Sequence, residues 1–159
     1  HIIKNEVSLT ELSVGSGKTV MATEIIRRLN YKTLFVVDVS VLLKQTKDEF
    51  ERLLGIECGL ITNGEQNWKD VNVATIQTIV KFIKNKDKEF MNNLKECNLV
   101  IVDEAHISKA KSYDLLMNNV NARYRFGLSA TPYAYGNNSL EIYRSFGFPK
   151  INISLQDLI

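Results

Sequence analysis

Short apolar runs alternate with longer segments of helical periodicity along this chain of 159 residues. Apolar runs bounded by turn residues are typical of buried strands, and apolar residues spaced three and four apart are typical of helices. The strict alternation of the two predicts an α/β fold with a mainly parallel central sheet and helices on both of its faces. The predicted strands are 7–12, 33–37, 58–62, 71–74, 99–102 and 124–128, and the predicted helices are 18–29, 41–54, 76–83, 89–96 and 113–120.

Two of these helices carry expectations about their ends and their inner faces. Ser40 is expected to cap the second helix and Gly55 to end it, because these residue types are favoured at those positions. The helical spacing of the apolar residues then predicts which side chains face the core. The first helix is expected to bury Val20, Ile25, Ile26 and Leu29, and the second Leu42, Leu43, Phe50, Leu53 and Leu54.

The composition is that of an ordinary globular domain, with 45% hydrophobic and 24% charged residues. No apolar run is long enough for a membrane span, and no signal-peptide pattern is present. Cys58 and Cys97 are isolated and lack metal-type spacing, which predicts reduced thiols and a cytoplasmic protein, in a host cytoplasm if the gene is carried by a phage. The net charge of +2 neither demands nor excludes a nucleic-acid partner.

Both ends of the chain suggest that it is part of a longer protein. The chain opens on His1, and its last residues read SLQDLI, an apolar-periodic stretch without a helix stop signal. We therefore expect residues 1–159 to form a single domain within a larger polypeptide.

The loop after the first predicted strand reads GSGKT and precedes a predicted helix. Two glycines allow a tight turn that aims backbone N–H groups inward, and the helix adds the positive end of its dipole. The sequence therefore predicts a phosphate-binding loop. In it the ammonium of Lys18 would reach the terminal phosphates and the hydroxyl of Thr19 would bind Mg²⁺. The candidate nucleotide-binding residues are Gly15, Ser16, Gly17, Lys18 and Thr19.

One position departs from the usual phosphate-loop pattern, which opens on a glycine. Leu12 stands there. Because this position lies at the end of the strand, before the amides that would face the phosphates, a side chain there does not have to collide with the phosphates. The alternative interpretation is a glycine turn followed by a surface lysine.

Two carboxylates follow the apolar strand in LVIVDEAH, residues 99–106. Ligands bind at the carboxyl ends of strands in open α/β sheets. Asp103 is placed there to hold Mg²⁺, and Glu104 to orient and deprotonate an attacking water. Taken alone, the pair could be two solvated acids. Together with GSGKT it points to hydrolysis of a nucleotide.

These segments resemble motifs of the superfamily 2 helicases, in the same order along the chain. GSGKT, DEAH at 103–106 and SAT at 129–131 look like motifs I, II and III of the first motor domain, a RecA-like P-loop NTPase. Segments 34–50 and 71–79 are similar to motifs Ia and Ib. The loop and the TIQ of 75–77 look most like the restriction-motor and phage branch-migration branch.

The resemblance implies ATP and Mg²⁺ as nucleotide and cofactor, and it assigns roles to residues. Lys18 and Glu104 would be catalytic, and Thr19 and Asp103 would hold the metal. Three further residues would couple the nucleotide state to a partner domain: His106, Ser129 and Thr131. For His106 the alternative is an ordinary core or surface histidine, and for the SAT segment it is a strand end turned by Pro132.

The resemblance also implies two partners, a nucleic acid and a second RecA-like domain in the same polypeptide. Thr75 and Gln77 would lie at the nucleic-acid contact, with backbone N–H groups near Thr75 touching phosphates. The alternative is that Thr75 is simply a good helix cap. We expect DNA rather than RNA. An RNA helicase and a non-hydrolysing scaffold module remain open as alternatives.

Three features depart from the family pattern or extend it. Asp38 and Val39 stand where motif Ia often carries a basic residue, and no glutamine-bearing adenine-recognition segment precedes the loop. A basic cluster lies beyond motif Ib. It is interpreted as a solvated helix face, with a nucleic-acid-facing surface as the alternative, and it consists of Lys81, Lys84, Lys86 and Lys88.

Overall fold

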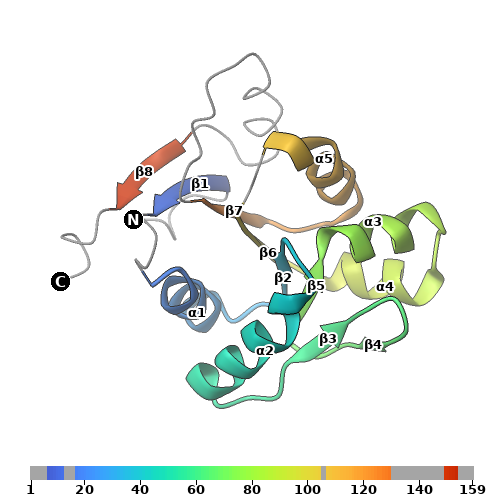
Figure 1. Ribbon diagram of the computed structural model, residues 1–159, viewed down its shortest axis with the longest axis horizontal. Coiled ribbons are helices and arrows are strands. Elements are labelled where there is room, and N and C mark those ends of the chain that lie inside the picture. Colours follow the sequence, from blue (N-terminus) through green and yellow to red (C-terminus); the bar gives the residue numbers. More distant parts are fainter. Residues whose placement is uncertain (1–6, 13–16, 105–106, 130–148, 154–159) are drawn as a thin grey trace.

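The computed structural model of the chain describes residues 7–12, 17–104, 107–129 and 149–153. Within these ranges the strands form one sheet of eight (Figure 1). The strands are β1 (Val7–Leu12), β2 (Thr33–Val37), β3 (Gly59–Ile61), β4 (Gln66–Asn67), β5 (Val71–Thr75), β6 (Leu99–Asp103), β7 (Tyr124–Ser129) and β8 (Pro149–Ile153). Their order is β4-β3-β5-β2-β6-β7-β1-β8, and only the β3–β4 pair is antiparallel.

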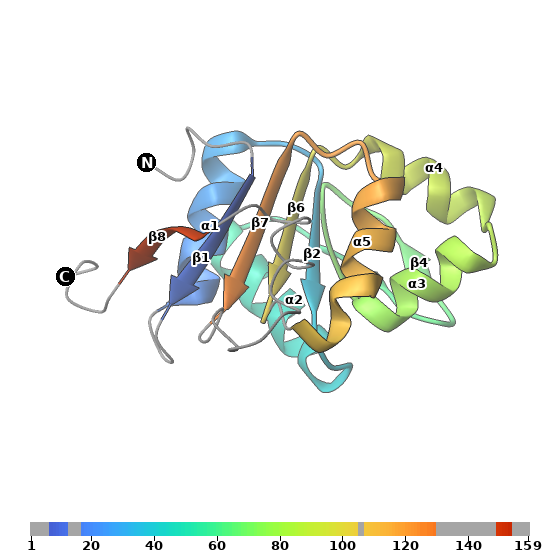
Figure 2. The same ribbon diagram turned by 90° about the horizontal axis from the view of Figure 1, so that it is seen from above.

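Helices cover both faces of this sheet, as Figures 1 and 2 show. The helices are α1 (Lys18–Leu29), α2 (Val41–Leu54), α3 (Ile76–Lys84), α4 (Lys88–Glu96) and α5 (Ala110–Asn119), with a short 3-10 turn, η2 (Ile107–Lys109), before α5. The first two helices lie on one face, and α3, α4 and α5 lie on the other. The predicted fold class is confirmed. No helix within the described residues is long and apolar enough to cross a membrane.

The alternation of side chains along β2 and β6 divides the core in two. Leu34 and Val36 point into the cluster under α3, α4 and α5, whereas Phe35 and Val37 point into the cluster under α1 and α2. Both faces are covered, which explains why these strands read as unbroken apolar runs rather than as an alternation with polar residues. Burial of each such side chain contributes about 1.5–3 kcal/mol.

The sequence pattern missed two strands and the 3-10 turn. β4 is only two residues long, too short for any periodicity. β8 begins with Pro149 and lies at an edge of the described sheet, where a residue without an N–H group is tolerated. In addition, α5 begins at Ala110, three residues before the predicted start.

Two expectations about helix faces and caps were wrong. Val20 is 59% exposed, whereas Ala22, Thr23, Ile25 and Ile26 form the buried face of α1. Because successive helical residues are about 100° apart, Val20 lies far around the helix from Ala22 and cannot share its face. Ser40 occupies the N-cap position of α2, but its side chain makes no capping hydrogen bond there.

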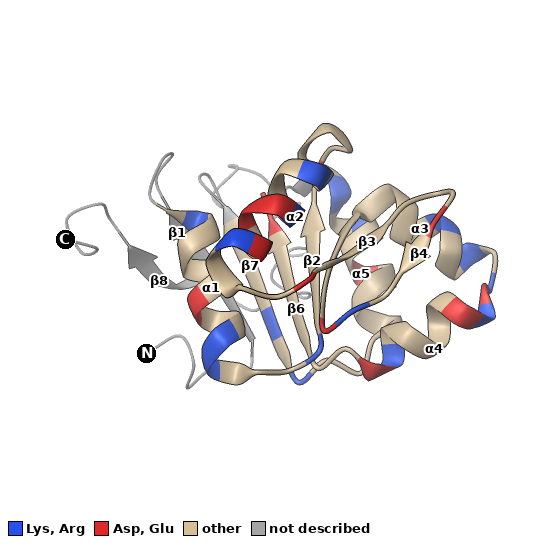
Figure 3. Cartoon of the chain, turned by 90° about the horizontal axis from the view of Figure 1, so that it is seen from below, with Lys and Arg blue, Asp and Glu red and all other residues tan. Residues whose placement is uncertain are grey.

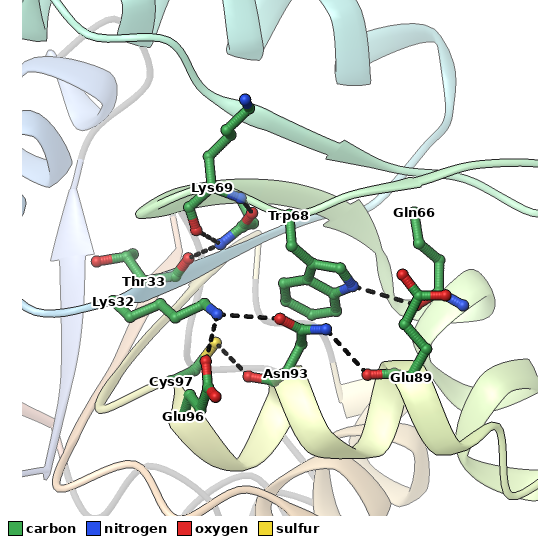
Figure 4. Close-up of polar contacts among 10 residues, drawn as sticks. Lys32, Thr33, Gln66, Trp68, Lys69, Glu89, Asn93, Glu96 and Cys97 are labelled. Atoms are coloured by element: carbon green, nitrogen blue, oxygen red, sulfur yellow. Dashed lines mark hydrogen bonds and ion pairs between the residues drawn. The ribbon is translucent and has the colours of Figure 1, made fainter.

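A polar network closes the edge of the sheet at the amino ends of the strands (Figure 4). The ammonium of Lys32 donates to Asn93 Oδ1 at 3.1 Å and pairs with Glu96 Oε2 at 2.7 Å, and it lies 5.6 Å from the ring centre of Trp68. The indole N–H of Trp68 donates to Gln66 Oε1 at 3.1 Å. These contacts tie α4 and the β3–β4 hairpin to the start of β2.

Gly59 is required where β3 meets this network. A Cβ atom at this position would lie 2.2 Å from Asn72 Oδ1 and 2.3 Å from the carbonyl oxygen of Asn67. Asn72 is fully buried, and its amide donates to the carbonyl oxygens of Thr33 and Lys69. A larger residue at position 59 would displace this buried amide.

Candidate functional site

The carboxyl ends of five parallel strands meet at one edge of the sheet. The arrowheads of β1, β7 and β2 point the same way in Figure 2, and the register pairs Glu11 with Ser129, and Val37 with Thr75. Asp103, the last residue of β6, pairs with Leu128 of β7. The described segments at this edge contain six of the residues singled out from the sequence: Lys18, Thr19, Thr75, Gln77, Asp103 and Glu104.

Gly17 forms the turn into α1 with a left-handed backbone, φ 74° and ψ 37°. A residue with a Cβ atom is strained in this region, so the glycine is required by the backbone itself. Its carbonyl accepts the first helical bond from Met21 N–H at 2.9 Å. No acidic residue stands in the first turn of α1, so the positive end of the helix dipole is not neutralised from within the helix.

Lys18 joins the phosphate-loop segment to the two carboxylates. Its ammonium forms an ion pair with Glu104 Oε1 and lies 3.7 Å from Asp103 Oδ1. The three side chains are each between 20% and 29% exposed. β7 lies between β1 and β6, so the two strands are about 10 Å apart. The lysine side chain and the carboxylate side chains together bridge this separation.

Glu104 has a backbone conformation that suggests a role beyond folding. Its φ is 51°, in the left-handed region, which costs about 1–2 kcal/mol for a residue with a Cβ atom. The other residues with positive φ in the described ranges are Asn30, Lys86 and glycines. Asn30 serves as the C-cap of α1, a position where this conformation is ordinary. Glu104, by contrast, lies directly after a strand and beside Lys18.

The donor groups at this edge fit a Mg²⁺ ion that is shared with phosphates. The hydroxyl of Thr19 and the carboxylate of Asp103 are hard oxygen ligands. The described residues contain no cluster of three or more His, Cys, Asp or Glu side chains that could hold a metal by themselves. Mg²⁺ is commonly bound by one or two carboxylates together with substrate phosphates.

Several predicted site residues cannot be placed in this geometry. Gly15, Ser16, His106 and Thr131 lie outside the described residues. Ser129 ends β7 at the same edge as Asp103, and only its backbone is described. The roles predicted for these residues therefore stay predictions.

Thr75 and Gln77 both lie at this edge but face different surroundings. Thr75 is 4% exposed, and its oxygen accepts from Thr78 N–H at 3.2 Å and contacts Thr78 Oγ1 at 3.0 Å. Its hydroxyl therefore serves as the helix cap, the alternative use noted from the sequence. Gln77 is exposed in the first turn of α3. A side-chain contact with nucleic acid at this turn is thus a prediction for Gln77 rather than for the Thr75 hydroxyl.

The basic cluster extends from the end of α3 to the start of α4, where Figure 3 shows blue segments. Its four lysines, Lys81, Lys84, Lys86 and Lys88, are all exposed. α3 begins at the carboxyl edge and runs away from it, so Lys84, Lys86 and Lys88 lie at or beyond the far end of the helix from Gln77, whereas Lys81 lies one turn from Gln77. This placement is compatible with the interpretation as a solvated face.

Sequence reasoning missed one ion pair at the carboxyl edge. Lys109 pairs with the carboxylate of Asp38, 71 residues away along the chain, and also donates to the carbonyl oxygen of Asp38 at 3.3 Å. Asp38 was noted only because a basic residue was expected in its place. Nothing in the local sequence around Lys109 marks it as the partner.

Comparison with known protein families adds a family match to this geometry. A sequence model of the family described as Type III restriction enzyme, res subunit, matches residues 4–134 of the chain. The DNA 3'-5' translocase XPB2 of Sulfurisphaera tokodaii is 28% identical over 130 residues, which make up 82% of this chain and 28% of that relative. The chain therefore spans little more than a quarter of the length of this curated relative.

Solved structures of similar fold include two helicases. The UvsW helicase from bacteriophage T4 matches with a TM-score of 0.72 and 21% identity, over 94% of this chain and 55% of that one. A hypothetical ATP-dependent RNA helicase from Sulfolobus tokodaii matches with a TM-score of 0.73 and 17% identity, over 96% and 49% of the two chains. At these identities the matches show the fold.

Proposed function

Because this chain belongs to the family of the Type III restriction enzyme res subunit and is a superfamily 2 helicase motor domain of RecA-like fold, we propose that it is the ATP-binding domain of an ATP-dependent DNA helicase or translocase. In this proposal the domain hydrolyses ATP and uses the reaction to move the protein along nucleic acid. Its substrates are ATP and a strand of DNA.

One observation carries the proposal: the ammonium of Lys18 contacts the carboxylates of both Asp103 and Glu104. Lys18 is 85 residues from Asp103 and 86 from Glu104 in the sequence, yet the three side chains meet at one sheet edge. A nucleotide-binding loop and a pair of carboxylates at the same edge are the parts that phosphoryl transfer to water requires.

Each side chain at this edge has a distinct role in the proposal. Lys18 binds the terminal phosphates, and Glu104 orients the attacking water and accepts its proton. The hydroxyl of Thr19 and the carboxylate of Asp103 hold Mg²⁺. When bound, the ion neutralises charge that develops on the phosphate oxygens.

The ammonium of Lys18 forms an ion pair with the carboxylate of Glu104. A phosphate oxygen and a carboxylate oxygen compete for the same ammonium, since both are anionic acceptors. Binding of ATP therefore transfers Lys18 from the carboxylate to the phosphate and frees Glu104 to act on water. The pair is partly exposed and adds little to the stability of the fold.

The remaining parts of the proposal lie outside this site. His106, Ser129 and Thr131 couple the nucleotide state to a second RecA-like domain of the same polypeptide. Gln77 and the backbone near Thr75 contact the sugar-phosphate chain. The protein works in a cytoplasm, where its two cysteines stay reduced; both thiols are free and buried in the structure.

The decisive experiment measures ATPase activity of the full-length gene product, with and without single-stranded DNA. We expect stimulation by DNA, and a loss of about 10²–10⁴ in kcat for Glu104→Gln because the general base is removed. Nucleotide affinity should be kept or increased, since the competing carboxylate is gone. A Glu104→Gln variant as active as the wild type, together with no stimulation by nucleic acid, would favour the non-hydrolysing scaffold and end this proposal.

The same assay separates DNA from RNA. Stimulation is compared for single-stranded DNA and RNA of identical sequence, because only contacts to the 2′-hydroxyl distinguish them at a given site. We expect the larger stimulation with DNA. A stronger effect of RNA would turn the assignment into an RNA helicase without changing the roles of Lys18, Asp103 or Glu104.

For residues 1–159 alone we expect weak binding of ATP, slow hydrolysis and no unwinding. Arginine fingers from a partner domain contribute about 10³–10⁵ to the rate in nucleotide hydrolases of this type. Strand-displacement assays on the isolated chain test this expectation, and robust unwinding would contradict it.

A further inference from the structure

An ion pair at the carboxyl edge connects two segments that the candidate ATP site does not use directly. Lys109 pairs with the carboxylate of Asp38 and donates to the carbonyl oxygen of the same residue at 3.3 Å. The two side chains are 25% and 26% exposed, similar to the Lys18–Glu104 pair beside them. Lys109 thus holds Asp38 by both its backbone and its side chain.

The pair lies between the proposed ATP site and the proposed nucleic-acid contact. β2 stands between β5 and β6 in the sheet. Asp38 directly follows β2, Glu104 directly follows β6, and Gln77 lies in the first turn after β5. Along the edge, the segment that begins at Asp38 therefore separates the acidic pair from the segment proposed to touch nucleic acid.

Helix stability does not account for this pair. Lys109 is the N-cap residue of α5, where a positive charge opposes the helix dipole and a Ser, Thr or Asp is favoured. Its side chain makes no capping bond. Asp38, for its part, lies two residues before the N-cap of α2 and is not the cap. The charges are instead arranged to hold the two segments together.

The segment after Asp38 leads directly into α2. Val39 O accepts from Leu42 N–H at 3.1 Å, and Ser40 O accepts from Leu43 N–H at 3.1 Å, so the chain passes from Asp38 straight into α2. Val39 and Val41 are 43% and 78% exposed at this edge. Because Val39 and Val41 lie within one helical turn of Asp38, a displacement of Asp38 would move these exposed side chains as well.

We propose that Asp38 and Lys109 are positioning residues that couple the ATP site to the nucleic-acid contact. Lys109 follows Glu104 by five residues in the sequence. In this proposal, a change at Glu104 when Lys18 binds a phosphate is passed on to the ammonium that anchors Asp38. The segment 38–41 moves with it, next to Gln77. This inference rests on the proposed function, since it assigns the pair to the communication between the two sites.

The test compares basal and DNA-stimulated ATPase of the full-length protein in Lys109→Met, Asp38→Asn and Lys109→Arg. Mutations in coupled networks change coupling by a modest factor, so we expect stimulation by single-stranded DNA to fall about fivefold in the first two variants. Basal kcat and the KM for ATP should stay within about twofold of wild type. Lys109→Arg keeps the charge and should keep most of the stimulation.

A charge-swap variant, Asp38→Lys with Lys109→Asp, tests the pair itself. Asp38→Lys and Lys109→Asp are also measured singly, and recovery of stimulation beyond the product of their two effects measures the coupling between the residues. Thermal unfolding shows whether Lys109→Met folds, and if it does not, the charge-swap variant provides the test. Stimulation by DNA in the swap variant supports the proposal. A folded swap variant that DNA does not stimulate contradicts it.

The Lys47–Glu51 pair on α2 supplies a matched control, because its side chains are 22% and 29% exposed and its geometry is a similar lysine–carboxylate contact. Lys47→Met should leave the stimulation factor unchanged. Three results would overturn the coupling role. The first is unchanged stimulation in Lys109→Met and Asp38→Asn, and the second is an equal loss of basal and stimulated activity in these variants. The third is a loss of stimulation in Lys47→Met as large as in Lys109→Met. A wild-type protein that no nucleic acid stimulates would instead overturn the proposed function, and this inference with it.

Discussion

Lys18 is the residue that brings the motifs of this chain into one site. Its position at the first turn of α1 comes from the sequence next to it, whereas its carboxylate partners come from β6. The phosphate-loop pattern and the acidic pair each have an ordinary alternative interpretation when taken alone. The contact shows that their charged groups belong to one arrangement. A glycine turn with a surface lysine would not place its ammonium between two carboxylates.

The two cysteines allow a prediction that concerns single residues and pH. Burial raises the pKa of the Cys58 thiol to about 11 and that of Cys97 to about 12. At pH 8, about one Cys58 thiol in a thousand, and fewer for Cys97, is the reactive thiolate. We expect alkylation of the native chain to be far slower than that of the unfolded chain at pH 8, and to speed up toward pH 11.

Mass spectrometry after timed alkylation measures this difference, with Cys58→Ala and Cys97→Ala as single-site controls. Rapid labelling of the native chain at pH 8 would show that the thiols are accessible and ionised, contrary to their burial.

At the scale of elements, the first turn of α3 carries two residues with different roles, a helix cap and a candidate nucleic-acid contact. Thr75 caps the helix from a buried position, and Gln77 is exposed. Thr75→Ala should lower the free energy of unfolding by about 1 kcal/mol, the usual cost of losing such a cap. Gln77→Ala should leave stability within about 0.5 kcal/mol and weaken binding to single-stranded DNA.

Urea unfolding and DNA titrations of both variants in the full-length protein test this division. Equal stability of Thr75→Ala and wild type would mean that the cap contributes nothing. Unchanged DNA affinity of Gln77→Ala would remove Gln77 from the proposed contact.

At the scale of the whole molecule, a nucleotide bound at the carboxyl edge of the sheet should raise the free energy of unfolding of the chain. A ligand that binds only the folded chain stabilises it by about 2.7 kcal/mol at a concentration 100 times its dissociation constant. For a chain of this size the midpoint of thermal unfolding should then rise by roughly 5–10 °C with saturating Mg²⁺ and ADP. Lys18→Met should abolish most of this rise.

Thermal unfolding of residues 1–159 with and without Mg²⁺ and ADP measures the effect. Lys44→Met, at an exposed position on α2, is the control and should keep the full rise. A full rise in Lys18→Met would place the nucleotide away from the carboxyl edge.

The order of elements and the position of the motifs within them were determined by the sequence alone. Strand and helix periods are local, and so are acidic residues at strand ends. This is why Lys18 and Thr19 were expected at the start of a helix, and Asp103 and Glu104 at the end of a strand, where the structure has them. The same locality explains the confirmed fold class. It also explains the misses: β4 is too short to show a period, and the inner face of α1 depends on what packs against it, so Val20 was assigned to the wrong side.

Only the tertiary structure decided which of these segments meet. The placement of β7 between β1 and β6, the contact of Lys18 with Asp103 and Glu104, and the pairing of Lys109 with Asp38 all join residues far apart in the chain. Strand order and ion-pair partners follow from the packing of the whole sheet, because local periodicity carries no information about which distant residue will become a neighbour. The candidate residues and a common edge for Lys18, Asp103 and Glu104 could be expected from the sequence, but the contacts that join them, and the additional pair at this edge, came from the fold.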